Sequence, residues 1–201
     1  MQKFFLLMAA MLLLISSCAT QNHSLSLKKK SNIAYNTTFS NVNLSPYENS
    51  FLAKINQIRT KGNRCAPATT PLRKNFYLQK AAMMHAKDMA LHNFLSHTGS
   101  ADVTDMAKKS SGAGSSFIDR IIFFGYQVAP NNLVGENIAK TIIKKGENNT
   151  LTQHFQRALE KMLNDPVHCK ILMNPRFQEI GIGVYKGNDA YYWVFDFGER
   201  I

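Results

Sequence analysis

The sequence predicts an α+β domain in which helices cover a sheet, because four segments of helical pattern precede two alternating strands. The chain has 201 residues, of which 45% are hydrophobic and 18% are charged. This length suits one well-buried domain, and this composition is typical of a packed globule rather than a disordered chain. Helices first and a hairpin last indicate separate layers of helix and sheet.

The first two helices are predicted from apolar residues at helical spacing. Such residues predict a first helix over about 47–60, which ends near Gly62. A second helix is expected over about 75–93, and its apolar face includes two histidines. Because His85 and His92 are seven residues apart on this helix, they are expected to stabilise the core or its edge.

Capping signals mark the third and fourth helices. The segment Ser116-Phe117-Ile118-Asp119 resembles a capping box, and Gly125 closes the helix that it starts. Thr150 caps the fourth helix, which ends at Pro166 and the residue before it.

Two strands close the chain. Apolar residues alternate with glycine and tyrosine from Ile180 to Tyr185. The segment 186–189 then forms a turn into a second strand over 191–197. These two strands are expected to pair as a hairpin.

Residues 1–17 have the features of a bacterial lipoprotein signal peptide. Lys3 is followed by twelve uncharged residues from Phe4 to Ile15, too few to span a bilayer, which needs about 20. The segment Ile15-Ser16-Ser17-Cys18 resembles a lipobox, in which the cysteine is diacylated and becomes the mature N-terminus. An ordinary secretory signal with a chance cysteine is the alternative. Lipidation of Cys18 would anchor the chain to a membrane of the cell envelope, which is the outer membrane in a Gram-negative cell.

The rest of the chain divides into a tether over 18–46 and a domain over 47–201. The tether is rich in Ser, Asn, Thr and Lys and is predicted to be flexible. The net charge is +11, and ten of the 24 Lys and Arg lie in residues 18–80 with Glu48 as the single acid. Because residues 81–201 are almost neutral, the charge favours a membrane or envelope polymer over nucleic acid as a partner.

Three clusters of residues form the most distinctive motifs of the chain. They are Asn93-Phe94-Leu95-Ser96-His97-Thr98-Gly99, Gly135-Glu136-Asn137, and the run from His168 to Gly183. In this order and spacing they resemble the bacterial branch of the CAP superfamily, named for cysteine-rich secretory proteins, antigen 5 and pathogenesis-related proteins. The resemblance covers about 48–198 and implies a three-layer α-β-α sandwich with a surface cleft.

The resemblance also implies which residues line the cleft, because two histidines and two acids do so in this family. Matched by motif, His97, Glu136 and His168 take three of these positions. The fourth position has two candidates, Asp165 and Glu160. Val167 stands where family members often carry Gly, so the turn before His168 is expected to differ.

Two imidazoles and a carboxylate that converge in a cleft suit more than one chemistry. They could bind a divalent metal, Zn²⁺ or Ca²⁺, or act as an acid–base set. A polar cluster that ties loops to the sheet is the alternative. Nucleophilic catalysis by Ser96 lacks support, because the sequence has no nucleophile-elbow motif.

The resemblance further implies a disulfide between Cys65 and Cys169. Bacterial relatives with a cysteine directly after the second histidine tend to carry another in the loop after the first helix. An exported chain folds where disulfides persist, and lipidation of Cys18 leaves an even pair. Two free thiols are the alternative.

Two classes of function are therefore expected. The first is a surface-tethered binding module that presents the cleft to a lipid, peptide or envelope ligand. The second is a metal-assisted hydrolase that acts on peptide or cell-envelope substrates through His97, Glu136 and His168.

Overall fold

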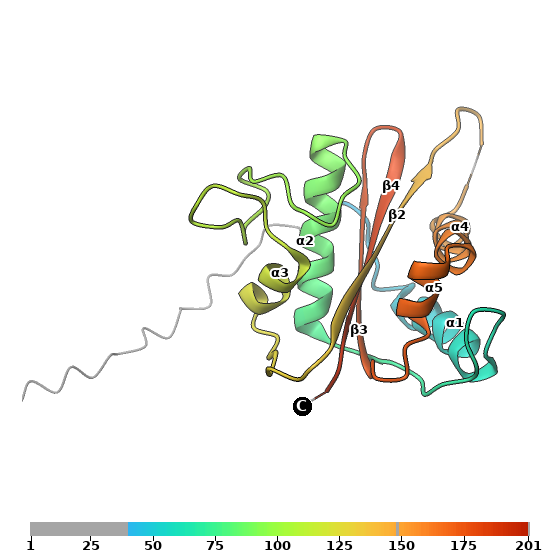
Figure 1. Cartoon of the computed structure of the whole chain (residues 1–201). Helices are drawn as coiled ribbons and strands as arrows, with labels where there is room; N and C mark the ends of the chain where they lie inside the picture. The colour runs from blue at the N-terminus through green and yellow to red at the C-terminus, as the bar shows by residue number, and fades with distance from the viewer. Residues whose placement is uncertain (1–39, 148, 201) are drawn as a thin grey trace, which may run out of the picture. The chain divides into compact units, whose positions relative to one another are not determined.

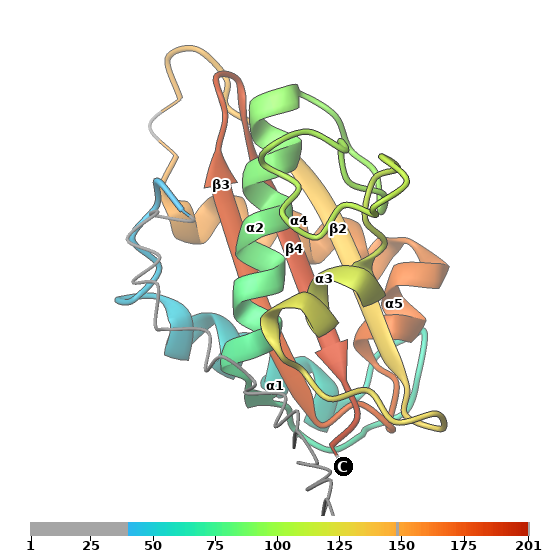
Figure 2. The same cartoon turned by 90° about the vertical axis from the view of Figure 1, so that its left-hand side faces the viewer.

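A four-stranded sheet lies between two layers of helices in the computed structural model, which describes residues 40–147 and 149–200 (Figure 1). Helices α2 and α3 cover one face of the sheet, and α1, α4 and α5 cover the other (Figures 1 and 2). The α+β class and the three layers predicted from the sequence are confirmed. The elements are α1 (Glu48–Lys61), β1 (Arg73–Lys74), α2 (Phe76–His92), α3 (Phe117–Phe124), β2 (Val134–Ile142), α4 (Leu151–Asn164), α5 (Pro166–Leu172), β3 (Glu179–Lys186) and β4 (Ala190–Gly198).

The strands lie in the order β1-β3-β4-β2. The predicted hairpin is present as the antiparallel pair of β3 and β4, and β2 pairs antiparallel with the other edge of β4. This second pairing places Glu136 directly opposite Asp196. The short strand β1 pairs parallel with β3. Neither β1 nor β2 was expected from the sequence pattern.

The two faces of the sheet pack differently. Aromatic side chains fill the space under α1 and α4, where the rings of Phe51 and Phe155 stack with centroids 3.9 Å apart beside Trp193. On the other face, the backbone of α2 lies directly on β3. A Cβ on Gly181 or Gly183 would come within 2.1 or 2.2 Å of that helix backbone. The alternation of glycine in β3 therefore lets helix and sheet approach closely.

The capping predictions for α3 and α4 are confirmed. Ser116 and Thr150 each form a capping box with the third residue of their helix, and Gly125 ends α3 in the left-handed conformation. Pro166 follows the end of α4 as expected, but it also starts α5, which the sequence interpretation missed. The Asp165 side chain caps α5 by accepting from the backbone N–H groups of Val167 and His168, and proline at the first helical position already has a helical φ.

The predicted disulfide between Cys65 and Cys169 is present and joins positions 104 residues apart. The buried Arg59 of α1 strengthens the same junction, because its guanidinium donates to the backbone carbonyls of Thr70, Leu172, Asn174 and Phe177. The loop after α1 is thus joined to α5 by a covalent bond, and α1 itself is held to the C-terminal end of α5 and the segment after it by hydrogen bonds.

The expected signal peptide, Cys18 and most of the tether lie outside the described residues. Within the described part of the chain, no helix is long and apolar enough to cross a membrane.

Candidate functional site

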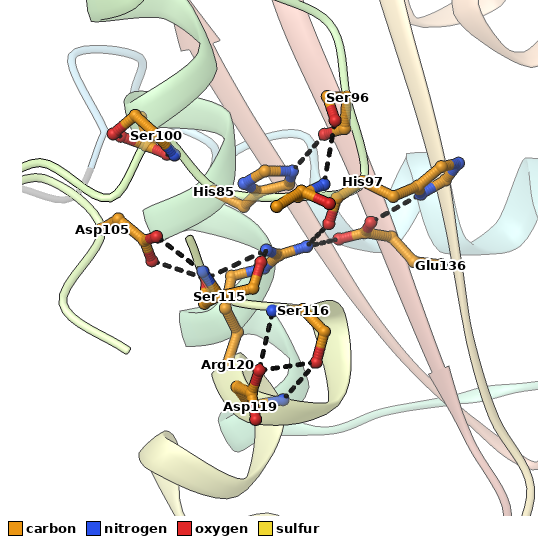
Figure 3. Close-up of polar contacts among 12 residues, drawn as sticks. His85, Ser96, His97, Ser100, Asp105, Ser115, Ser116, Asp119, Arg120 and Glu136 are labelled. Atoms are coloured by element: carbon orange, nitrogen blue, oxygen red, sulfur yellow. Dashed lines mark hydrogen bonds and ion pairs between the residues drawn. The ribbon is translucent and has the colours of Figure 1, made fainter. Parts of the chain in front are cut away.

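The loop between α2 and α3 carries His97, and two buried aspartates hold this loop in place. Asp88 of α2 accepts hydrogen bonds from the backbone N–H and the hydroxyl of Ser100. Asp105, inside the loop, accepts from the backbone N–H and the hydroxyl of Ser115 (Figure 3). Because both carboxylates are fully engaged, they fix the loop rather than offer free ligands.

His97 and Glu136 form the centre of the site. Nδ1 of His97 lies 2.7 Å from Oε1 of Glu136 (Figure 3). Glu136 extends from β2 and its side chain is fully buried, whereas half of the His97 side chain is exposed. A carboxylate fixes Nδ1 as the donor, so Nε2 of His97 is the nitrogen that remains available.

Arg120 of α3 completes this pair from below, and sequence reasoning missed it. Its Nη2 lies 2.7 Å from Oε2 of Glu136 and 3.0 Å from the backbone carbonyl of His97 (Figure 3). Burial raises the pKa of Glu136, but the hydrogen bond from His97 and the charge of Arg120 outweigh it and lower the pKa below its usual range. The signal in the sequence was an arginine in a short helix whose other charged residue, Asp119, is used by the capping box, since a buried charge needs a partner.

Asp196 is a second buried acid that the sequence analysis did not single out. It lies opposite Glu136 on β4, and none of the described donors reaches its oxygens. Because directly opposed residues of an antiparallel pair share one face of the sheet, the charge of Glu136 opposes ionisation of Asp196. Burial and the charge of Glu136 raise the pKa of Asp196 well above its usual range, so Asp196 is the neutral partner.

The two histidines of α2 lie beneath the loop and at its edge. His85 is fully buried, and its Nε2 lies 2.7 Å from the carbonyl of Ser96 (Figure 3). Burial lowers its pKa, so the ring is neutral and acts as a donor that holds the residue before His97. His92 lies at the end of the helix, 3.0 Å from the hydroxyl of Thr104.

His168 reaches the same site from α5. Its ring centroid lies 6.4 Å from that of His97, and its Nδ1 lies 3.0 Å from Oδ1 of Asp165. The side chain of Asn137 donates to the carbonyl of His168 and so ties α5 to β2. Of the residues expected from the sequence, His97, Glu136 and His168 thus lie together. Asp165 lies beside His168, whereas Glu160 is exposed on α4.

A pocket of about 380 Å³ opens beside the pair of His97 and Glu136. Its walls come from the start of α3, the start of β2, α5 and the segment after α5. Most of the lining is apolar, and the polar residues that line it are His97, Glu136, Lys170 and Asn174. The apolar lining consists of Phe117, Leu133, Val134, Gly135, Ile171 and Phe177.

Glu136 is the carboxylate of the expected metal site. Both oxygens of Glu136 are engaged, one by His97 and one by Arg120. Across residues 40–147 and 149–200, no three His, Cys, Asp or Glu side chains are grouped as ligands for a metal ion. A zinc or calcium site therefore stays a prediction from the sequence.

Comparisons with known proteins agree with this fold. The model of the family described as "Cysteine-rich secretory protein family", or CAP, matches residues 52–197. An outer surface protein from Borrelia burgdorferi is 20% identical, with a TM-score of 0.56 over 80% of this chain and 97% of that chain. An extracellular protein containing a SCP domain, from Bacillus anthracis, is 23% identical, with a TM-score of 0.50 over 78% of this chain and 43% of that chain. The comparison with curated proteins gave no match.

Proposed function

Because the chain belongs to the cysteine-rich secretory protein family, we propose that it is an exported binding module whose pocket beside His97 takes up the apolar part of a ligand. The observation that carries this proposal is the pocket itself. An apolar pocket with a few convergent polar groups is typical of small-ligand sites, and its volume of about 380 Å³ lies within their usual range.

The proposed location of this module is the outer side of a cell membrane, with Cys18 as the lipid anchor and residues 18–46 as the tether. The signal sequence and lipobox support export and anchoring. The disulfide supports export, because disulfides persist in oxidising compartments. The two similar solved structures belong to an outer surface protein and to an extracellular protein, which agrees with such a location.

A pocket-filling variant tests the proposal. The neutral fluorescent probe N-phenyl-1-naphthylamine is titrated into the wild-type chain, Ile171→Trp and Ile142→Trp. Ile171 lines the pocket, whereas Ile142 is 48% exposed at the end of β2 and provides the same change elsewhere. We expect Ile171→Trp to weaken probe binding at least tenfold and Ile142→Trp to leave it unchanged. Equal binding by all three proteins would show that the pocket is not the site.

The geometry of His97 favours a hydrolase as the second candidate. A histidine whose Nδ1 is held by a buried carboxylate is oriented to accept a proton at Nε2, as a general base does. A serine nucleophile is not supported, because Oγ of Ser96 accepts from the backbone N–H of Thr98. The test compares turnover of a peptide library by the wild type and a His97→Ala, His168→Ala double variant, together with the zinc and calcium content of each. Equal turnover would exclude these residues as catalysts.

A further inference from the structure

The rim of the pocket carries two hydrogen-bond donors, the side chains of Lys170 and Asn174. Lys170 lies on the exposed side of α5, and its side chain forms no hydrogen bond or ion pair with the part of the chain that the structure describes. Oδ1 of Asn174 accepts from the backbone N–H of Arg176 at 2.9 Å. Because this contact fixes the amide, the Nδ2 of Asn174 is its free end. Two donors, one of them charged, therefore lie at the same pocket.

The charges around the pocket do not cancel. Glu136 is balanced by Arg120, and both side chains are fully buried. His168 lies beside Asp165. Lys170 is the remaining charged residue of the lining, so the mouth of the pocket keeps one positive charge without a partner among residues 40–147 and 149–200. A ligand that complements this arrangement has a negative group next to an apolar one.

We propose that the pocket binds the carboxyl end of a short peptide whose last side chain is apolar. This inference rests on the proposed binding function and names the chemistry of its ligand. The apolar side chain packs against Phe117, Ile171 and Phe177. The terminal carboxylate accepts hydrogen bonds from Lys170 and Asn174.

The available nitrogen of His97 distinguishes a peptide from a fatty acid. Both ligands carry a carboxylate next to an apolar group, so both complement Lys170 and the apolar walls. In the neutral ring of His97, Nδ1 donates to Glu136 and Nε2 is left as an acceptor. An amide N–H of a peptide supplies a donor for this nitrogen, whereas a fatty acid has none and would leave an acceptor unpaired as the pocket loses water.

Binding of matched ligands to the full chain tests the inference. N-acetyl-Ala-Ala-Leu is compared with its C-terminal amide, with N-acetyl-Ala-Ala-Asp and with decanoate, each by calorimetry and by displacement of N-phenyl-1-naphthylamine. We expect the leucine peptide to bind at least tenfold tighter than its amide and than the aspartate peptide. Lys170→Gln is expected to remove the preference for the free carboxylate. Lys145→Gln, at an exposed lysine outside the pocket, is the control and should behave as the wild type.

Each outcome separates this inference from the proposed function. If the neutral probe binds and Ile171→Trp blocks it, but the peptide acid and its amide bind equally, the carboxylate inference is wrong and the binding function stands. If decanoate binds and the leucine peptide does not, the ligand is a lipid acid rather than a peptide. If no probe or ligand binds, both proposals fail.

Discussion

The contribution of the disulfide between Cys65 and Cys169 to stability can be predicted from the length of the loop that it closes. The bond closes a loop of 104 residues between the segment after α1 and α5. In the chain-entropy model, closing such a loop lowers the entropy of the unfolded state and so raises its free energy by about 4.7 kcal/mol at 25 °C. The 160 described residues have an unfolding entropy of about 2.1 cal/mol/K each. Dividing the free energy by this entropy gives a fall of about 14 °C in Tm when the disulfide is removed.

The perturbation is a Cys65→Ser, Cys169→Ser double variant, and the assay is thermal unfolding followed by circular dichroism with and without a phosphine reductant. We expect the reduced wild type and the double variant to melt at the same temperature, about 14 °C below the oxidised wild type. The double variant should not respond to the reductant, which is the internal control.

The same structure limits what the disulfide does for the site. Arg59 still donates to three backbone carbonyls around the end of α5 when the bond is absent. Probe binding by the double variant at 20 °C is therefore expected to stay within about threefold of the wild type, equivalent to less than about 1 kcal/mol. A fall in Tm below about 4 °C would refute the entropy argument, and lost binding in a folded variant would show that the disulfide positions α5.

Three further perturbations test the buried cluster and the packing of α2. Arg120→Met leaves the buried carboxylate of Glu136 without its counter-charge, so urea unfolding should show a loss of about 3–5 kcal/mol; a loss below 1 kcal/mol would contradict the assigned pairing. Asp196 has a folded pKa above its unfolded value of about 3.9, so its contribution is complete below that pH and declines as the pH rises toward the folded pKa. Between the two pKa values the slope reaches about 1.4 kcal/mol per pH unit, and Asp196→Asn should reduce the pH dependence of urea unfolding above about pH 4.5. Identical pH dependence of the two proteins would show that Asp196 is ionised. Gly181→Ala places a Cβ 2.1 Å from the backbone of α2 and should cost about 3 kcal/mol of stability or prevent folding. The control Gly112→Ala meets no atom within 4 Å and should cost about 1 kcal/mol through its positive φ alone. Urea unfolding of both variants measures these losses, and equal losses would contradict the close approach of α2 to β3.

Local chemistry explains why much of the fold could be predicted. The capping boxes at Ser116 and Thr150 and the left-handed Gly125 are decided by residues within a few positions of one another. The alternation in β3 and β4 likewise shows within one segment. By contrast, β2 carries the mixed sequence VGENIAKTI, and it is a strand because the edge of β4 was available to pair with it. The helix α5 has seven residues, so its start depends on the cap at Asp165 more than on periodicity.

Some residues of the candidate site could likewise be identified from the sequence, and others only from the tertiary structure. The motifs of the sequence were sufficient to single out His97, Glu136 and His168, and the family resemblance to pair Cys65 with Cys169, because those residues stand in recognisable local segments. That Arg120 balances Glu136 was decided by tertiary structure. It depends on how α3 docks against the strand that carries Glu136.

Asp196 and the pocket were also decided by tertiary structure. The register of β2 against β4 sets one acid opposite another, and burial then makes Asp196 the neutral partner. The pocket forms where α3, β2 and α5 meet, and Lys170 at its mouth has no counter-charge among the residues that the structure describes. The physical reason is that the sequence shows which residues can be charged, whereas the pKa of each group depends on its burial and its partner, and these are set by long-range packing.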